Sequence, residues 1–165
     1  MEQKTEQIEQ YVISILVANQ FGVLTRVSAM FARRGFNIDS LAVGETESPA
    51  LSRITVVAHG SQHEKEQMLR QLEKLEDVTE IREMAPASSM YRELLLVKVR
   101  SNAENRHEIL DVVSVFRAKI IDYATDSISI EMTGETQKLN AFIELMRPFG
   151  IIKLCRTGIV ALERG

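Results

Sequence analysis

Residues 11–35 read YVISILVANQFGVLTRVSAMFARRG and contain two patterns in direct succession. Tyr11–Ala18 is an almost unbroken apolar run rich in β-branched residues, which predicts a strand buried on both faces or nearly so. In Val23–Phe31 the apolar residues recur at helical spacing, and Gly35 ends that pattern. The stretch therefore predicts a strand followed by an amphipathic helix, with a short polar loop between them.

The residues that follow complete one domain. Residues 37–47 and 51–59 predict two strands that pair as a hairpin. Ser61 and Glu64 have the spacing of a capping box, which predicts the start of a second helix. Residues 78–84 predict a fourth strand, so the element order is βαββαβ.

The same order begins again after a short loop of small residues at 85–89. The expected elements are a strand at 94–99, a helix opened by a capping box at Ser101 and Glu104, strands at 119–124 and 127–133, a helix ended by Pro148 and Gly150, and a last strand from Ile151 toward Leu162. The chain is therefore expected to be α+β, with two ferredoxin-like βαββαβ domains in tandem, each an antiparallel sheet with helices on one face. The expected division is a polar extension at 1–10 and domains at 11–85 and 86–165.

The composition is that of a folded globular protein of 165 residues, with 45% hydrophobic and 26% charged residues and a formal charge of −3. No apolar run approaches the length of about 20 residues that a membrane helix needs. The polar start of the chain does not resemble a signal peptide, and the single cysteine, Cys155, excludes an internal disulfide. We expect a cytoplasmic protein without a membrane segment, with Cys155 as a buried, inert thiol in an apolar strand.

Reactive groups are sparse in the sequence. There are three histidines and no glycine-rich phosphate loop, and we find no catalytic acid–base pair. His59 and His63 are four residues apart, but the predicted boundary places them on a strand end and a helix start, which favours surface histidines over a metal site. An independent small enzyme is therefore disfavoured.

An RNA-binding module shares the βαββαβ order, but it requires aromatic residues on its central strands and a basic surface. Here only 5% of the residues are aromatic. Residues 1–90 hold 9 basic and 13 acidic side chains, and residues 91–165 hold 11 and 10. Nucleic acid is therefore not an expected partner.

One loop has the features of a ligand site. Gly22 allows a close backbone approach, and the amides of Val23 and Leu24, at the start of the following helix, suit a carboxylate. Asn19 before the loop, and Asn37 with Ile38 after the helix, add polar and apolar groups that suit a small amino acid. The alternative reading is purely structural, with Asn19 as a helix cap, Gly22 as a turn residue and Asn37 as a helix-exit residue.

These residues also carry a family resemblance. The motif Asn19-x-x-Gly22-Val23-Leu24, with Arg26-Val27 and Phe31-x-x-Arg34-Gly35-Phe36-Asn37-Ile38 after it, resembles the amino-terminal ACT domain of the small regulatory subunit of acetohydroxyacid (acetolactate) synthase. The likeness extends through Leu51–Thr55, Arg92–Val99, Phe116–Asp122 and Arg156–Gly158, over nearly the whole chain. Phe21 departs from the family, which often has a small residue or proline there.

The resemblance implies a non-catalytic subunit that activates a catalytic large subunit and confers feedback inhibition by valine or another branched-chain amino acid. Thiamine diphosphate, Mg²⁺ and FAD would lie on the large subunit, and this chain would hold no cofactor, metal or catalytic residue. Residues 11–85 would be the ACT domain, which pairs as a homodimer. The effector would bind at the pair interface, at Asn19, Gly22, Val23, Leu24, Asn37 and Ile38. Valine, leucine and isoleucine remain alternatives, and Arg33 and Arg34 are candidates either for the large-subunit contact or for a solvated helix end.

Overall fold

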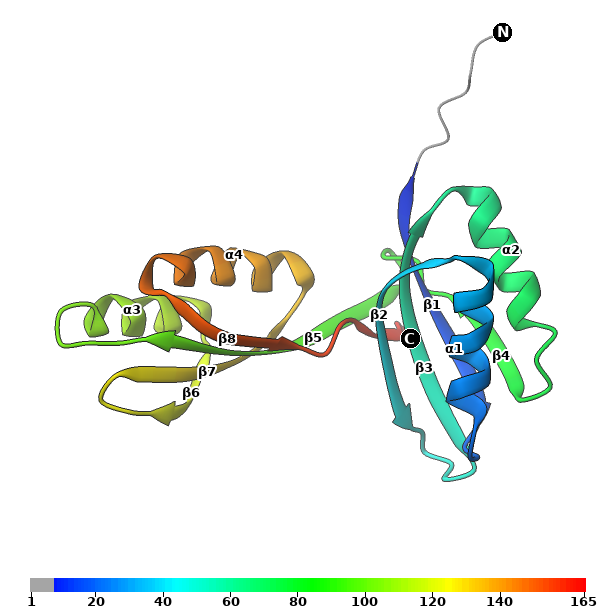
Figure 1. The fold of residues 1–165 in the computed structure, drawn as a ribbon, viewed down its shortest axis with the longest axis horizontal. Coiled ribbons are helices and arrows are strands. Elements are labelled where there is room, and N and C mark those ends of the chain that lie inside the picture. Colours follow the sequence, from blue (N-terminus) through cyan, green and yellow to red (C-terminus); the bar gives the residue numbers. More distant parts are fainter. Residues whose placement is uncertain (1–7) are drawn as a thin grey trace, which may run out of the picture. The chain divides into compact units, whose positions relative to one another are not determined.

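A computed structural model describes residues 8–165 and shows the βαββαβ order twice (Figure 1). The first set of elements is β1 (Glu9–Ala18), α1 (Val23–Arg34), β2 (Asn37–Glu45), β3 (Leu51–Gly60), α2 (Gln62–Leu72) and β4 (Val78–Glu83). The second set is β5 (Ser89–Arg100), α3 (Arg106–Phe116), β6 (Lys119–Tyr123), β7 (Ser127–Gly134), α4 (Thr136–Met146), a 3₁₀ turn (Arg147–Phe149) and β8 (Ile151–Arg156), followed by β9 (Val160–Glu163). The expected α+β class is confirmed.

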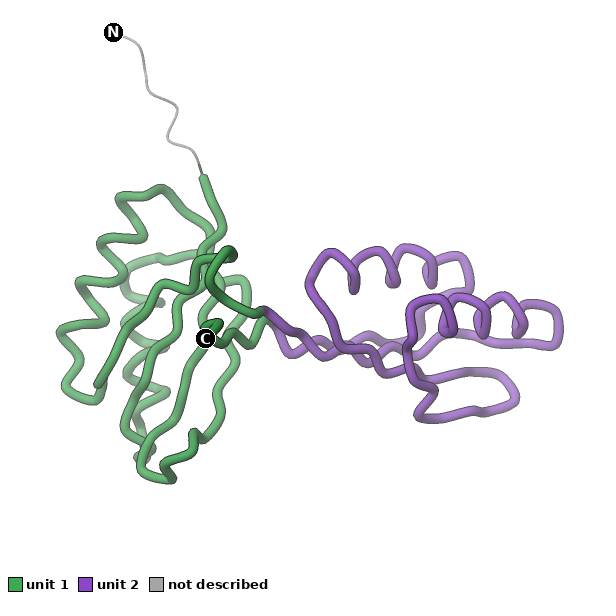
Figure 2. The backbone as a smooth tube through the Cα atoms, turned by 180° about the vertical axis from the view of Figure 1, so that it is seen from behind, with its two compact units in different colours: residues 1–90, 159–165 green, residues 91–158 purple. Residues whose placement is uncertain are grey.

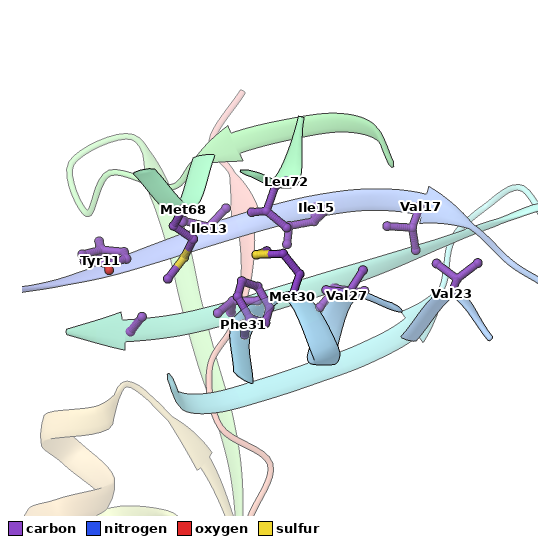
Figure 3. Packing of buried hydrophobic residues seen from close by; sticks show 13 residues of the cluster. Tyr11, Ile13, Ile15, Val17, Val23, Val27, Met30, Phe31, Met68 and Leu72 are labelled. Carbon is purple, nitrogen blue, oxygen red and sulfur yellow. The ribbon is translucent and has the colours of Figure 1, made fainter. Parts of the chain in front are cut away.

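The first sheet has the strand order β2-β3-β1-β4, with every neighbouring pair antiparallel. β2 and β4 are therefore its edge strands. Along β1 the residues alternate in direction, and Ile13 and Ile15 join the helices in one apolar core (Figure 3). From α1, Val27 and Phe31 enter the same core at helical spacing. The hydrophobic pattern thus places both helices on one face of the sheet.

The helix ends follow local chemistry. The expected capping box opens α2, where the Ser61 hydroxyl accepts from the Glu64 amide at 3.3 Å and the Glu64 carboxylate accepts from the Ser61 amide at 2.7 Å. The second expected box, at Ser101 and Glu104, is wrong. The Asn102 side chain instead accepts from the amides of Glu104 and Asn105 in a local turn, so α3 begins only at Arg106.

The second sheet has the order β6-β7-β5-β8, and β9 also pairs with β5. Its helix-facing core contains Leu95, Val97 and Ile130 from the strands and Phe142 from α4. Phe116 of α3 packs edge-to-face on Phe142, with ring centroids 5.3 Å apart. The second half therefore has a hydrophobic core of its own.

The chain forms two compact units, residues 1–90 with 159–165 and residues 91–158 (Figure 2). This differs from a division at 85/86 in that the last seven residues join the first unit. The single last strand expected from Ile151 toward Leu162 is wrong, because it is interrupted at Thr157–Ile159 and continues as β9. Of the expected extension at 1–10, residues 1–7 lie outside the described residues, and Glu9 and Gln10 already belong to β1.

The C-terminal residues help to bury the first unit's second face. Val12 and Val57 are cross-strand partners on the side of the sheet opposite the helices, and both are buried. Ile159 and Ala161 are buried as well. Arg82 Nη1 lies 2.6 Å from Glu163 Oε2, at a small hollow of about 130 Å³ that Arg53, Met84 and Ala161 also line. The end of the chain is thus part of the first unit's packing.

Candidate functional site

The loop between β1 and α1 is held against the β2–β3 turn by Asn19. Its side-chain Nδ2 donates to the Pro49 carbonyl at 2.9 Å and to Glu45 Oε1 at 3.3 Å. Its backbone amide donates to the Ala50 carbonyl at 2.8 Å. Asn19 therefore does not cap α1, since Gly22 occupies the N-cap position and no side chain caps it. Of the structural alternative, the reading of Asn19 as a helix cap is wrong, while Gly22 does lie in a turn.

Gly22 has the backbone conformation that the loop requires. Its φ of 83° lies in the left-handed region, which glycine adopts without steric cost. The amides of Leu24 and Thr25 follow in the first helical turn, where no intrahelical acceptor is available. Within residues 8–165 neither amide donates to a loop carbonyl or to a side chain, so this turn presents free donors to a small anion.

A cation lies beside these donors. A Cβ placed on Gly22 would lie 3.0 Å from Arg26 Nη1, so the guanidinium covers this glycine. Arg26 Nε in turn donates to Asp77 Oδ2 at 2.6 Å. This hydrogen bond lowers the pKa of Asp77 and raises that of Arg26, so both groups are charged at neutral pH. Arg26 was not among the predicted site residues, although its position one helical turn after Gly22 could have indicated it.

The side chains of the predicted loop residues point in different directions. Val23 is buried in the helix–sheet core, and its amide donates to the Gln20 carbonyl at 3.4 Å, so the expectation that the Val23 amide would hold a carboxylate is wrong. Leu24 is 44% exposed, and Phe21 is fully exposed at the outer surface of the loop. The apolar group that a ligand would meet at this end of the helix is therefore Leu24 or Phe21.

Asn37 and Ile38 lie at the other end of α1. They begin β2, where Asn37 is opposite His59 and Ile38 is opposite Ala58. α1 has 12 residues, and at 1.5 Å of rise per residue it separates the two ends by about 18 Å. Asn37 is exposed, while Ile38 packs partly against the core. One chain thus brings Asn19, Gly22, Val23 and Leu24 together but leaves Asn37 and Ile38 apart from them.

The histidines have separate partners. His59 Nδ1 pairs with Asp39, and His63 Nε2 lies 2.9 Å from the side-chain amide of Gln67. In the described part of the chain, no group of three or more His, Cys, Asp or Glu side chains is arranged to hold a metal ion. Cys155 is exposed on β8, so the expectation of a buried thiol is wrong. Cys155 is opposite Leu96 in the β5–β8 pair, on the sheet face away from the core residues Leu95 and Val97, and this face leaves the thiol open to solvent.

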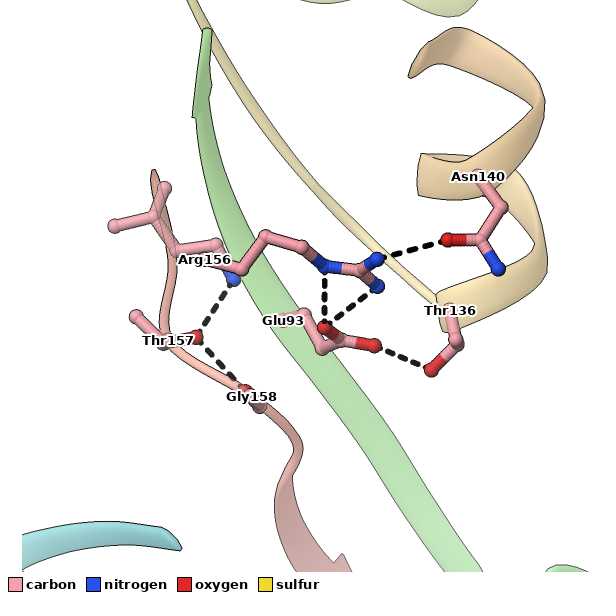
Figure 4. A network of polar contacts seen from close by, with 7 residues as sticks. Glu93, Thr136, Asn140, Arg156, Thr157 and Gly158 are labelled. Atoms are coloured by element: carbon pink, nitrogen blue, oxygen red, sulfur yellow. Dashed lines mark hydrogen bonds and ion pairs between the residues drawn. The ribbon is translucent and has the colours of Figure 1, made fainter. Parts of the chain in front are cut away.

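A second polar cluster lies in residues 91–158 and is centred on a buried carboxylate (Figure 4). Glu93 Oε2 accepts from Arg156 Nε at 3.0 Å and from Arg156 Nη2 at 2.8 Å, while Glu93 Oε1 accepts from the Thr136 hydroxyl. Arg156 Nη1 also donates to Asn140 Oδ1 at 2.8 Å. Two donors of Arg156 thus meet one oxygen of Glu93 and join β8 to β5, while Thr136 and Asn140 connect the pair to α4. Both oxygens of the Glu93 carboxylate are thus satisfied by the fold, which indicates a structural role.

The matches to known protein families cover both halves of the chain. The family model described as an AHAS small subunit-like ACT domain matches residues 13–80, and the model described as the small subunit of acetolactate synthase matches residues 92–165. No helix within residues 8–165 is long and apolar enough to cross a bilayer. Each of the two matched ranges covers most of one βαββαβ unit of the structure.

Individual relatives match over nearly their full length. A probable acetolactate synthase small subunit of Archaeoglobus fulgidus is 47% identical over 94% of this chain and 98% of its own. A probable small subunit of Methanothermobacter thermautotrophicus is 44% identical, over 95% of this chain and 94% of its own. The crystal structure of the Thermotoga maritima acetolactate synthase small subunit superposes with a TM-score of 0.89 and 40% identity, covering 95% of this chain and 98% of that one.

Proposed function

The chain belongs to the family of acetolactate synthase small subunits, and from that premise we propose that it is a feedback sensor for a branched-chain amino acid. In this proposal it activates the catalytic large subunit and transmits inhibition by valine, or by leucine or isoleucine, in the biosynthesis of these amino acids. It supplies no catalytic residue. Thiamine diphosphate, Mg²⁺ and FAD belong to the large subunit, and both subunits work in the cytoplasm.

The observation that carries the proposal is the set of groups at the start of α1. The free amides of Leu24 and Thr25, with the Arg26 guanidinium beside Gly22, suit an α-carboxylate. Glu45, which contacts Asn19 in the same chain, offers a carboxylate for an α-ammonium group. An apolar side chain such as Leu24 suits a branched aliphatic tail. These complementary groups fit an amino acid better than they fit a simple anion.

A second copy of the chain completes the site. β2 is an edge strand, so its outer backbone groups are available to pair with another chain. Asn37 begins β2 and Glu45 ends it, and Glu45 contacts Asn19. If two β2 strands pair antiparallel about a twofold axis, the Asn37 end of one chain meets the Asn19 end of the other. The homodimer would thus hold two equivalent effector sites, each built from both chains.

Isothermal titration calorimetry with valine, leucine and isoleucine tests this function. The wild-type chain should bind one of them saturably, and Asn19→Ala and Asn37→Ala should each reduce the affinity at least tenfold. Gln20→Ala changes an exposed neighbour whose side chain makes no hydrogen bond within residues 8–165, and it serves as the matched control. If none of the three amino acids binds the chain alone or together with the large subunit, the proposed function is wrong.

A further inference from the structure

Four cationic side chains gather where α1 and α2 end. Arg33 and Arg34 form the last turn of α1, Arg70 lies in the last turn of α2, and Lys74 follows that helix. They line two neighbouring open hollows of about 460 Å³ each, which share Arg34, Gln71 and Lys74. We refer to the surface formed by Arg33, Arg34, Arg70, Gln71 and Lys74 as the cationic groove.

Most of the positive charge in the cationic groove is uncompensated. Arg70 pairs with Glu66 at 3.3 Å, but within residues 8–165 no ion pair involves Arg33, Arg34 or Lys74. Glu73 is the only carboxylate among the described residues that line the two hollows. The groove therefore has a net positive charge, although the whole chain has a formal charge of −3.

Helix capping explains only part of this arrangement. Cations near a helix C-terminus interact favourably with its carbonyl groups, and Arg33 Nε donates to the Ala29 carbonyl at 3.3 Å in that way. Arg34 instead crosses to the other helix, where its Nη2 donates to Gln71 Oε1 at 3.1 Å. Lys74 lies beyond the last residue of α2. The hydrogen bond to Gln71 uses only one of the five N–H donors of Arg34, and within residues 8–165 Lys74 has no ion pair, so both cations can still engage a partner.

The shape and lining of the cationic groove favour an acidic protein segment as its occupant. A guanidinium holds a carboxylate through paired hydrogen bonds, and Met30, Phe36 and Leu75 add apolar surface at the same hollows. A nucleic acid would need a longer basic track than these few cations provide. In the chain, α1 is followed by the edge strand β2, and α2 is followed by β4 at the opposite edge of the sheet. Pairing of two β2 strands uses the β2 edge alone, so the cationic groove between the two helices stays accessible.

We propose that the cationic groove docks an acidic segment of the acetolactate synthase large subunit. This inference rests on the proposed function and adds to it the surface through which the two subunits meet. It assigns the charge of α1 and α2 to subunit association. The effector site uses the loop before α1 together with Asn37 and Ile38 of the second copy, and none of these residues lines the two hollows. Association should therefore weaken with added salt, because solvent-exposed charge pairs are screened.

The test measures the affinity of the full chain for the large subunit of the same organism by biolayer interferometry, at about 50 mM and about 300 mM NaCl. The double variant Arg34→Gln/Lys74→Gln should bind about tenfold more weakly at low salt and should lose most of the salt dependence. The charge-preserving variant Arg34→Lys/Lys74→Arg should keep an affinity close to that of the wild type. Lys138→Gln/Lys153→Gln removes two exposed cations from the second unit and is the matched control.

The outcomes separate this inference from the proposed function. Calorimetry with the effector should give wild-type affinity for Arg34→Gln/Lys74→Gln, which shows that the fold and effector site are intact. If that variant binds the large subunit as tightly as the wild type, with the same salt dependence, the docking site is wrong while the proposed function stands. If the wild-type chain does not bind the large subunit at all, the inference and the proposed function both fail.

Discussion

The side-chain amide of Asn19 donates a hydrogen bond of 2.9 Å to the backbone carbonyl of Pro49, thirty residues away. This contact fixes the loop before α1 to the turn between β2 and β3. The same amide reaches Glu45 at the end of the edge strand. The hydrogen bonds of Asn19 thus link the proposed effector loop to β2, the proposed dimer edge.

Asn19→Ala should therefore cost both stability and effector binding. Loss of the hydrogen bond to Pro49 should lower the free energy of unfolding by about 1 kcal/mol. Urea denaturation followed by circular dichroism measures the change, with Gln20→Ala as control. Equal stability of the two variants would show that this contact does not hold the loop.

Gly22→Ala should distort the same loop from within. A φ of 83° is unfavourable for any residue with a Cβ, and the new methyl group would meet Arg26 at 3.0 Å. We expect a loss of about 1–2 kcal/mol in unfolding free energy, measured by urea denaturation, and much weaker effector binding.

Gly35→Ala provides the comparison for Gly22→Ala. Gly35 also has a positive φ, of 67°, but apart from its local backbone no atom of residues 8–165 lies within 4 Å of the position that an added Cβ would take. Gly35→Ala should therefore lower the unfolding free energy only by the cost of a positive φ in a residue with a Cβ. In an Arg26→Ala background, the Gly22→Ala penalty should fall toward the Gly35→Ala value, and an unchanged penalty would rule out the Arg26 contact as a cause.

Glu93→Ala should destabilise the chain strongly, because it leaves Arg156 without the carboxylate oxygen that accepts two of its hydrogen bonds. Glu93 is only 4% exposed, and breaking such a buried pair costs about 3 kcal/mol. Glu131→Ala removes a carboxylate that lies 3.9 Å from Lys119 near the surface and should cost less than about 1 kcal/mol. Comparable losses in guanidinium denaturation would contradict a structural role for the cluster in Figure 4.

The Arg82–Glu163 pair predicts a pH dependence of stability. The hydrogen bond from Arg82 lowers the pKa of Glu163 below its usual value of 4.5. The unfolded chain therefore binds this proton more readily, so the pair contributes stability above pH 4.5 and loses it as pH falls through the lower folded pKa.

Melting temperatures measured from above pH 4.5 down through the lower folded pKa of Glu163 test how much the Arg82–Glu163 pair contributes to stability. Glu163→Gln should remove part of the acid-induced decrease that the wild type shows, because the titrating group is gone. Glu47→Gln, at the β2–β3 turn, should leave the decrease unchanged. A wild-type decrease that persists in full in Glu163→Gln would place the acid sensitivity elsewhere.

Local patterns were sufficient to predict most of the fold. Apolar periodicity identified both βαββαβ sets, and the Ser61–Glu64 capping box opened α2 as expected. Errors arose where a side chain competed for local hydrogen bonds, as Asn102 does before α3. The sequence also could not show on which face of its sheet Cys155 lies, because that depends on the long-range register between β8 and β5.

The candidate site was predicted only in part for the same reason. Gly22 and the Leu24 amide are signals within one loop, so spacing alone indicated them, but the Val23 amide donates to Gln20 and the Thr25 amide was not predicted. The partner of Asn19 lies thirty residues away in a turn, and no local pattern indicates it. The separation of Asn37 from Asn19 along α1 became evident only from the folded chain, and it is the reason that the proposed effector site needs a second copy.

The most direct test of the two-chain effector site is complementation between Asn19→Ala and Asn37→Ala. The two variants are mixed under conditions of subunit exchange, and effector-binding capacity is measured by calorimetry. Each mixed dimer should regain one intact site from Asn19 of one chain and Asn37 of the other, so random mixing should restore about one quarter of the wild-type capacity. No recovery, from variants that each fold and dimerise, would contradict an effector site shared between two chains.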